Sequence, residues 1–273
     1  MLRLAAIANL WAQCRFPMTE KNTQPESTRK EPAPSVMPLP DAIHSAEHSE
    51  LLRAAADPTL TGDLALALLK RIDLPGDVLE QFSRNRNALK MRKAKIALAC
   101  HPHTPRHVSV PLIRQFFTFD LMKVALSPVV PGDVKLTADE TLISRLKTVT
   151  LGERLALARQ ASGRIAGALL LDENRVMRAA LENSRLTEAP VVHAVLKQAA
   201  SQALIQAVSS HAKWSYRRDV QVALLRTGHL SLARALKFAR EIAPPQLREI
   251  LNTSRLPAKI KQQLLRETAK SEK

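Results

Sequence analysis

Residues 51–61 read LLRAAADPTLT, and residues 177–187, which lie 126 positions later, read MRAALENSRLT. The same offset places 51–135 on 177–261 without a gap, with apolar residues opposite apolar residues over most of that length. The identical pairs include Arg92 with Arg218, His103 with His229, and Arg114 with Arg240. A long internal period with aligned apolar positions is typical of stacked-repeat proteins, which usually bind partners over an extended surface. The sequence therefore predicts two tandem copies of one structural unit.

The composition favours helices over strands. Of the 273 residues, 45% are apolar but only 3% are aromatic, and there are only 7 glycines. Leu and Ala are abundant, and no alternating Val/Ile/Thr run is bounded by hairpin-turn residues. We expect an all-α fold, specifically a right-handed α-solenoid of stacked helical hairpins in two halves with a 126-residue period.

Residues suited to starting a helix recur at matched positions. Thr and Ser side chains can accept the free N–H groups of a first helical turn, and Pro suits the first helical position because it has no N–H. The starts expected in the first half are Thr61, Pro75, Pro105 and Pro131, and those in the second half are Thr187, Ser201, Ser231 and Pro257. Between the halves, residues 150–153 predict a capping box, and Ser162-Gly163 predicts a break. We assign 42–136 to the first half, 137–175 to a middle helical pair, and 176–268 to the second half.

The two ends of the chain have a different composition. Residues 1–17 are either a weak leader or an upstream extension, and we expect translation to start at Met18. Residues 18–41 carry five prolines among polar residues and predict a disordered tail. Residues 269–273 are expected to be frayed.

The segment Val176–Thr187 resembles bacterial α-solenoid repeats of the HEAT-like and leucine-rich-repeat-variant kind, which combine an Arg-x-Ala-Leu…Asn-Pro-x-Leu-Thr/Pro unit with a following Val/Leu-rich helix. The resemblance covers about 50–268. The chain departs from this pattern where Ser184 and Ser254 stand in place of the usual turn proline. It also lacks the N-terminal cysteine cluster that some leucine-rich-repeat variants use for an iron–sulfur centre. The resemblance implies a binding scaffold and carries over no catalytic residue or cofactor.

Two basic clusters fall at matched positions in the two halves. Residues 84–95 hold six cations and no acid, and residues 210–221 combine cations with Trp214 and Tyr216. With a formal net charge of +16, such clusters favour polyanions, and aromatic residues beside cations can stack on bases. The alternative is a solvated helix face with both aromatic side chains inserted between repeats. The candidate polyanion-binding residues are Arg84, Arg86, Lys90, Arg92, Lys93, Lys213, Trp214, Arg217 and Arg218.

Metal binding is not expected. Cys100, His101, His103 and His107 have close spacing that could suit zinc, but only His103 has a matching histidine, His229, in the second half. Cys14 and Cys100 are expected to be reduced thiols of a cytoplasmic protein. We therefore expect no cofactor.

Catalysis has little support in the sequence. The carboxylate pairs Asp139-Glu140 and Asp172-Glu173 are adjacent residues, which point to different sides of a helix. No phosphate-binding loop, Gly-x-Ser-x-Gly or His-Glu-x-x-His motif occurs. Phe116, Phe117 and Phe119 are expected to form a packed hairpin corner followed by Asp120 as a helix cap.

These observations favour a non-enzymatic scaffold that binds a protein partner. The first alternative is sequence-independent binding of nucleic acid through the basic clusters. A base-modifying enzyme similar to HEAT-like DNA glycosylases is the second alternative, although no motif places its catalytic acid. No stretch is long and apolar enough to span a membrane.

Overall fold

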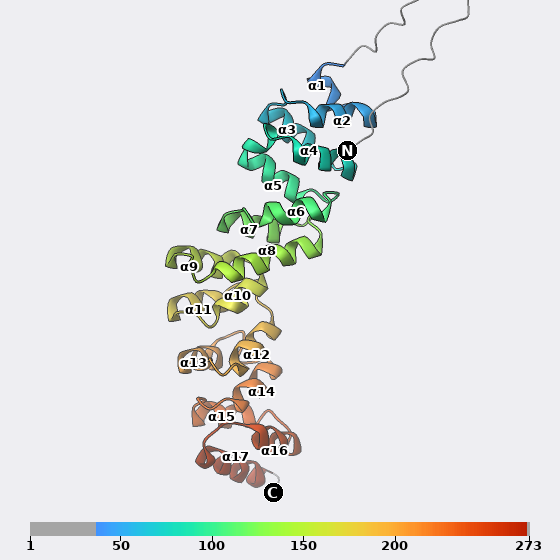
Figure 1. Ribbon diagram of the computed structural model, residues 1–273. Coiled ribbons are helices and arrows are strands. Elements are labelled where there is room, and N and C mark those ends of the chain that lie inside the picture. Colours follow the sequence, from blue (N-terminus) through green and yellow to red (C-terminus); the bar gives the residue numbers. More distant parts are fainter. Residues whose placement is uncertain (1–36, 272–273) are drawn as a thin grey trace, which may run out of the picture. The chain divides into compact units, whose positions relative to one another are not determined.

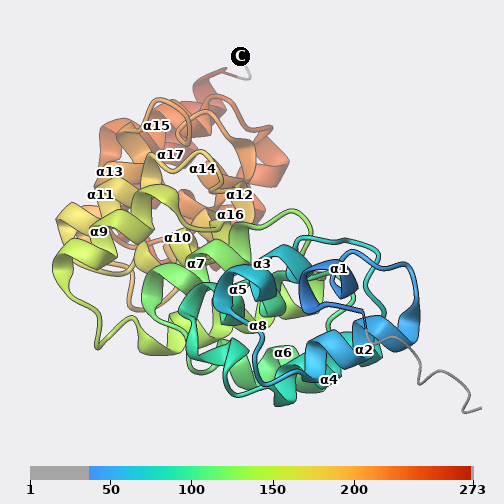
Figure 2. The same ribbon diagram turned by 90° about the horizontal axis from the view of Figure 1, so that it is seen from above.

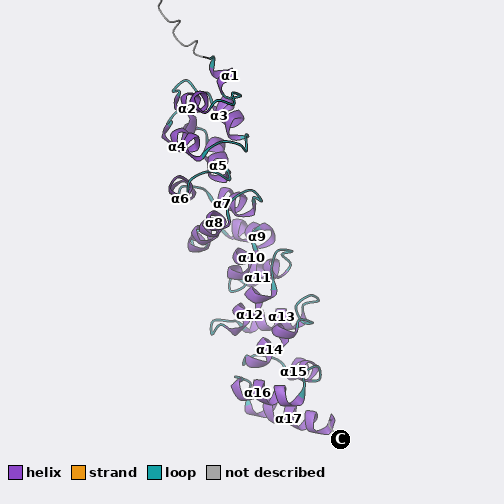
Figure 3. Ribbon diagram, turned by 90° about the vertical axis from the view of Figure 1, so that its right-hand side faces the viewer, coloured by secondary structure: helices purple, strands orange, loops and turns teal. Residues whose placement is uncertain are grey.

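A computed structural model describes residues 37–271, and the fold below is that of the unit Pro38–Lys273. The described residues form 17 α-helices and one short 3-10 helix, and they contain no strand (Figures 1 and 3). The all-α class expected from composition is therefore confirmed. Residues 1–17, and the part of the predicted tail before Met37, lie outside the described residues.

The helices are short and closely spaced. Most have 7 to 10 residues, whereas α8 and α17 have 14. Their bounds are α1 Leu39–Ala42, α2 His48–Ala56, α3 Gly62–Leu69, α4 Gly76–Arg84, η1 Ala88–Lys90, α5 Arg92–Cys100, α6 Arg106–Ile113, α7 Thr118–Leu126, α8 Gly132–Arg145, α9 Leu151–Gln160, α10 Gly163–Leu169, α11 Asn174–Leu181, α12 Glu188–Leu196, α13 Gln202–Ser210, α14 Arg218–Arg226, α15 Leu232–Ala239, α16 Pro244–Thr253 and α17 Ala258–Ser271. Helix α1 begins inside the segment expected to be a tail, and α17 extends past the expected end at 268.

All eight residues expected at helix starts stand directly before a helix. The hydroxyls of Thr61 and Ser201 accept N–H groups of the first turn, at 3.5 and 3.1 Å respectively. Pro75, Pro105 and Pro131 occupy the capping position instead of the first helical position, because each has extended backbone dihedrals. The capping box at Thr150 is present, since its hydroxyl and the Glu153 carboxylate bond to each other's backbone N–H.

Helices two apart in the chain pack against each other, which arranges them in two series. The contacts join α6, α8, α10, α12, α14 and α16 into one series, while α3, α5 and α7 form another beside it. The contacts α9–α11–α13 and α15–α17 follow the same rule (Figures 1 and 2). Short connections force consecutive helices into neighbouring series, and each helix then buries one face against the helix two ahead.

The core consists of two contiguous clusters of apolar side chains. One includes buried residues from Ala42 to Val108, and the other from Ala99 to Leu264. Small and branched side chains dominate both clusters, as the low aromatic content predicts. No helix in the described part of the chain is both long and apolar enough to cross a membrane.

Buried polar side chains form hydrogen bonds between successive layers of the stack, where a layer is a pair of consecutive helices. Asn85 Nδ2 donates to the carbonyl oxygens of Ala55 and Asp57, at 3.1 and 2.8 Å. Asn183 Nδ2 likewise donates to the carbonyl oxygens of Ala158 and Ala161, at 2.8 and 3.2 Å. Carbonyls at a helix C-terminus have no partner within their own helix, so these amides satisfy groups that would be costly to bury unpaired. Each such asparagine therefore fixes the distance between one layer and the next.

Candidate polyanion-binding surface

The first basic corner, residues 84–95, joins α4 to α5 through η1. Its shape is set by Asn85, whose Oδ1 accepts the N–H groups of Asn87 and Ala88 while its Nδ2 binds the preceding layer. These bonds turn the chain and leave the intervening cationic side chains outside the core. The corner therefore holds its positive charge on a backbone that is fixed in place.

Some cations of this corner form ion pairs within the protein and others do not. Arg84 pairs with Glu80 at 2.8 Å, and Arg92 pairs at 2.7 Å with Asp120, whose side chain is only 3% exposed. Arg86, Lys90 and Lys93 are exposed and have no ion-pair partner among the described residues. Arg86, Lys90 and Lys93 can therefore neutralise an external anion without breaking an existing ion pair.

The pairing of Arg92 also corrects an expectation about Asp120. Helix α7 begins after Phe117, so Asp120 lies in its first turn and does not cap it. The Arg92 guanidinium lies 4.9 Å from the ring centre of the exposed Phe117. Phe116, in contrast, is buried, so only part of the aromatic corner is packed inside.

The second basic corner, residues 210–221, joins α13 to α14. Trp214 is 1% exposed, and its Nε1 donates to the carbonyl oxygen of Leu181 at 3.0 Å. Its ring is therefore part of the core and is not accessible to a base. The neighbouring Tyr216 is 69% exposed and lies 5.2 Å from Lys237 Nζ, so it is the accessible aromatic side chain of this corner.

The cations of the second corner are also partly engaged. Lys213 Nζ lies 4.1 Å from the centre of the Trp214 ring and donates to the carbonyl oxygen of Leu186 at 3.3 Å. Arg218 donates to Gln246 Oε1 at 2.7 Å. Arg217 is exposed and has no ion-pair partner in the described part of the chain.

The two corners lie on different helix series. Helix α5 belongs to the series α3–α5–α7, whereas α14 belongs to the series that runs from α6 to α16. A matched helix stands nine places later in the chain, as α14 does relative to α5, and an odd shift moves it into the other series. Matched sequence positions therefore do not place the two clusters in one continuous row.

The cysteine and histidine residues near α5 serve packing and hydrogen bonding. His101 Nε2 donates to the Arg71 carbonyl oxygen at 2.7 Å, and His103 Nδ1 donates to that of Leu74 at 2.9 Å. Burial raises the pKa of the Cys100 thiol to about 11. No group of three His, Cys, Asp or Glu side chains in the described residues could hold a metal ion.

The carboxylate pairs are also engaged within the fold. Asp139 is buried and accepts a hydrogen bond from Ser162 Oγ at 2.8 Å, and burial raises the pKa of its carboxyl group. Asp172 and Glu173 both pair with Arg154. Their positions are explained by these structural contacts.

A surface that the sequence reasoning missed consists of two adjoining pockets, one between α10 and α12 and one between α12 and α14, which share Ala189 and His193. Between α10 and α12 it is lined by Arg164, Gly167, Ala168, Ala189, Pro190, His193 and Lys197. Between α12 and α14 it continues along Glu188, Val192, Leu196, Asp219, Val222, Ala223 and Arg226. We call this surface the α10–α14 groove. Its apolar residues look like ordinary core positions in the sequence, and only the stacking of α10, α12 and α14 exposes them together.

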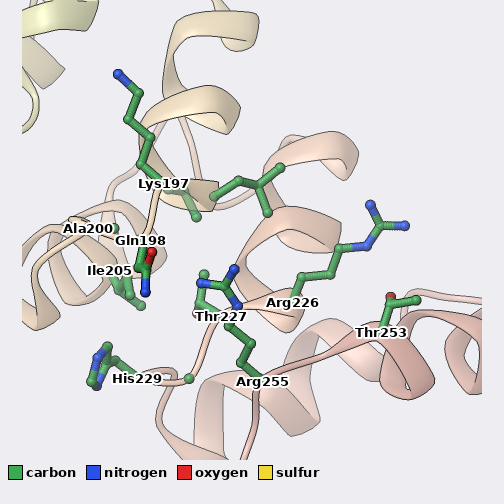
Figure 4. Close-up of a pocket in the computed structure, with 12 residues that line it drawn as sticks. Lys197, Gln198, Ala200, Ile205, Arg226, Thr227, His229, Thr253 and Arg255 are labelled. Carbon is green, nitrogen blue, oxygen red and sulfur yellow. The ribbon is translucent and has the colours of Figure 1, made fainter.

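A cavity of about 240 Å³ adjoins this groove, between the ends of α12, α14 and α16 (Figure 4). Its lining includes the cations Lys197, Arg226 and Arg255, and it shares Leu196, Lys197 and Arg226 with the groove. The alignment of the two halves offered one signal, because Arg226 and Arg255 replace Cys100 and Val129 at the matched positions.

Comparison with known proteins gives no relative from which a role could be inferred: no protein-family model, curated protein or solved structure matches this chain.

Proposed function

We propose that this protein is a non-enzymatic helical-repeat scaffold, an α-solenoid of the HEAT-like kind built from two tandem copies with a 126-residue period. Support comes from the helix bounds, since α5 spans 92–100 and α14 spans 218–226, and α8 spans 132–145 while α17 spans 258–271. The contacts between helices two apart give further support. We also propose a cytoplasmic location, which fits the free thiol of Cys100.

The observation that carries the scaffold proposal is the α10–α14 groove. Leu196 is 40% exposed beside Val192 and Val222, so the groove offers apolar surface that no other described element covers. A groove between stacked helices is a common binding site for an extended or helical segment of a partner.

The charge around the groove indicates what kind of segment it binds. The cations on its lining are Arg164, Lys197 and Arg226, with His193 between them, against the acids Glu188 and Asp219. The surrounding surface is also basic, since the chain carries a formal net charge of +16. A protein segment that combines apolar side chains with acidic ones would complement this surface best.

A single substitution in the groove tests the proposal. Leu196→Asp places a carboxylate on the apolar floor, and we expect it to weaken partner binding about tenfold or more. The matched control is Leu136→Asp on α8, because Leu136 is 44% exposed and lies outside the groove. Affinity capture at near-physiological salt, after nuclease treatment, should recover the same partner with wild type and Leu136→Asp but not with Leu196→Asp. Equal recovery by both variants would contradict the groove as the binding site.

The free cations of the first basic corner favour a second candidate function, sequence-independent binding of nucleic acid. Arg86, Lys90 and Lys93 are exposed and unpaired in the described part of the chain, and Tyr216 beside Arg217 offers an accessible ring at the second corner. Because each neutralised phosphate releases counterions, the affinity for single-stranded oligonucleotide should fall steeply with salt.

Charge reversal separates this function from the first. Changing Arg86, Lys90 and Lys93 to Glu should reduce the slope of log affinity against log salt by about two. Changing Lys147, Arg159 and Arg175 to Glu alters the net charge equally at exposed positions elsewhere. If both triple variants lose affinity to the same degree, binding reflects net charge and not this corner.

A further inference from the structure

The cavity between α12, α14 and α16 has a one-sided charge. Its charged lining side chains are Lys197, Arg226 and Arg255, accompanied by His229, and no Asp or Glu side chain contributes to the lining. None of these side chains has an ion-pair partner among the described residues. The chain thus places three permanent positive charges around one hollow without using them internally.

The backbone fixes Arg255 at this cavity. Ser254 Oγ donates to the carbonyl oxygen of Leu225 at 2.6 Å, and the Arg255 N–H donates to that of Arg226 at 3.1 Å. In Figure 4 the Arg255 side chain is directed toward Thr227, whereas Lys197 and Arg226 extend outward. Arg255 is therefore the inner cation, and the other two are long side chains on the rim.

The corner after α14 adds two backbone donors. The N–H groups of Gly228 and His229, which both line the cavity, have no hydrogen-bond acceptor among the described residues. At the matched corner after α5, Pro102 has no N–H, and the His103 N–H donates to His101 Nδ1 at 3.2 Å. The corner after α14 therefore has backbone N–H groups without an acceptor in the described chain, whereas the corner after α5 has none.

Helix dipoles explain only part of this arrangement. Arg226 ends α14 and Lys197 follows α12, so both stand where a cation complements a helix C-terminus. Arg255 follows α16 by two residues and is directed to the cavity, and the free N–H groups of Gly228 and His229 gain nothing from a cation nearby. These three groups are donors that lie at one cavity without an acceptor among the described residues, so an anion bound there would gain all of them.

We propose that this cavity binds a phosphoryl group, either of a small phosphate ester or of a nucleic-acid backbone. Phosphoryl oxygens accept several hydrogen bonds at once, and an arginine fork matches two of them. Backbone N–H groups at a turn supply further donors, as in other phosphate sites. A cavity of about 240 Å³ holds one phosphoryl group with the atoms attached to it. This site goes beyond the scaffold function and does not depend on it, because Arg255 lies outside the α10–α14 groove.

Binding of inorganic pyrophosphate, measured by isothermal titration calorimetry on the full chain at near-physiological salt, tests the site. We expect one pyrophosphate per chain for wild type, and an affinity lower by about tenfold or more for Arg255→Gln. Arg255→Lys keeps the charge but loses the fork, so its affinity should fall between the two. Arg178→Gln on α11 removes an exposed arginine elsewhere and should bind as wild type.

A second variant removes space without removing a cation. Thr227→His places an imidazole where the matched corner holds the buried His101, and we expect it to abolish pyrophosphate binding. Thermal unfolding of each variant checks that the fold is retained. The proposal is overturned if wild type binds no pyrophosphate, if Arg178→Gln and Arg255→Gln weaken binding equally, or if the folded Thr227→His variant binds as wild type.

Competition distinguishes the two sources of the phosphoryl group. A short single-stranded oligonucleotide that displaces pyrophosphate, and whose own binding weakens in Arg255→Gln, assigns the site to a nucleic-acid backbone. Pyrophosphate binding that such an oligonucleotide leaves unchanged assigns it to a small phosphorylated ligand. Arg255→Gln retains the α10–α14 groove, so loss of pyrophosphate with normal capture of a protein partner separates this site from the scaffold function.

Discussion

The corner after α5 and the corner after α14 lie 126 residues apart in the sequence and differ in how the space next to them is filled. At the first, the buried imidazole of His101 spans to the Arg71 carbonyl of the preceding layer. At the second, the matched residue is Thr227, whose hydroxyl donates to the Leu224 carbonyl of its own helix. Nothing from Thr227 reaches the preceding layer, and the cavity remains there.

The difference teaches that the side chain at this position contributes to whether the space between neighbouring helices is filled or left open. An imidazole is long enough to bridge two layers and has a donor and an acceptor on opposite sides of its ring. A threonine side chain is shorter, and the hydroxyl of Thr227 donates its hydrogen bond within its own helix. The backbone follows the same helix bounds at both corners, so the difference lies in the side chains. Thr227 replaces His101, and Arg226, Gly228 and Arg255 replace Cys100, Pro102 and Val129.

The strongest way to break this comparison is His101→Ala. The substitution leaves a void and removes the donor to the Arg71 carbonyl, so the free energy of unfolding should fall by about 2–4 kcal/mol. Thr227→Ala removes only a local hydroxyl bond and should cost about 1 kcal/mol. Urea unfolding of both variants measures the difference. Equal losses would mean that His101 does not seal its corner in the way described.

The protonation of His101 gives a smaller effect with a definite sign. Burial lowers the pKa of His101, and its Nδ1 must stay unprotonated to accept the His103 N–H. The unfolded state therefore binds more protons as pH falls below about 6.5, and stability should decrease by at most about 1.4 kcal/mol per pH unit. This loss should stop once the pH reaches the lowered pKa of the folded state.

Comparison with glutamine isolates the contribution of His101. His101→Gln keeps a donor for the Arg71 carbonyl but does not titrate, so its stability should change less than that of wild type between about pH 6.5 and 5. Asp139 acts with the opposite sign, since its raised pKa adds stability as pH falls, and it is present in both proteins. Parallel profiles for wild type and His101→Gln would contradict the assignment.

Much of the fold follows from local sequence signals. Thr61, Ser201 and Pro131 each precede a helix because a start depends on the few residues that cap it. The capping box at Thr150 is equally local. Such features depend on contacts within three or four residues, which the sequence displays directly.

The candidate sites depend on contacts between layers, and these were harder to predict. Trp214 has cationic neighbours in the sequence, but in the structure its indole is buried and donates a hydrogen bond to the Leu181 carbonyl oxygen at the end of α11. In the matched corner Ala88 is buried and Asn85 binds the corresponding carbonyl, that of Ala55. The cavity likewise brings together residues 195–200, 226–229 and 253–255, whose proximity no local pattern reveals.

The smallest effect on stability is expected at Cys100, which ends α5 beside the corner that His101 fills. Because burial raises its thiol pKa to about 11, the reactive thiolate is scarce at neutral pH. In a Cys14→Ser background, its reaction with a disulfide reagent near pH 8 should be slower in the folded protein than in urea by about 100-fold. Arg226 occupies the matched place at the open corner, so adding Arg226→Cys to a chain without the other cysteines should give a thiol that reacts at nearly the unfolded rate. The stability of either variant should change little, because both thiols are small and make no hydrogen bond to a neighbouring pair of helices. Similar reaction rates at the two positions would show that the two corners do not differ in access to solvent.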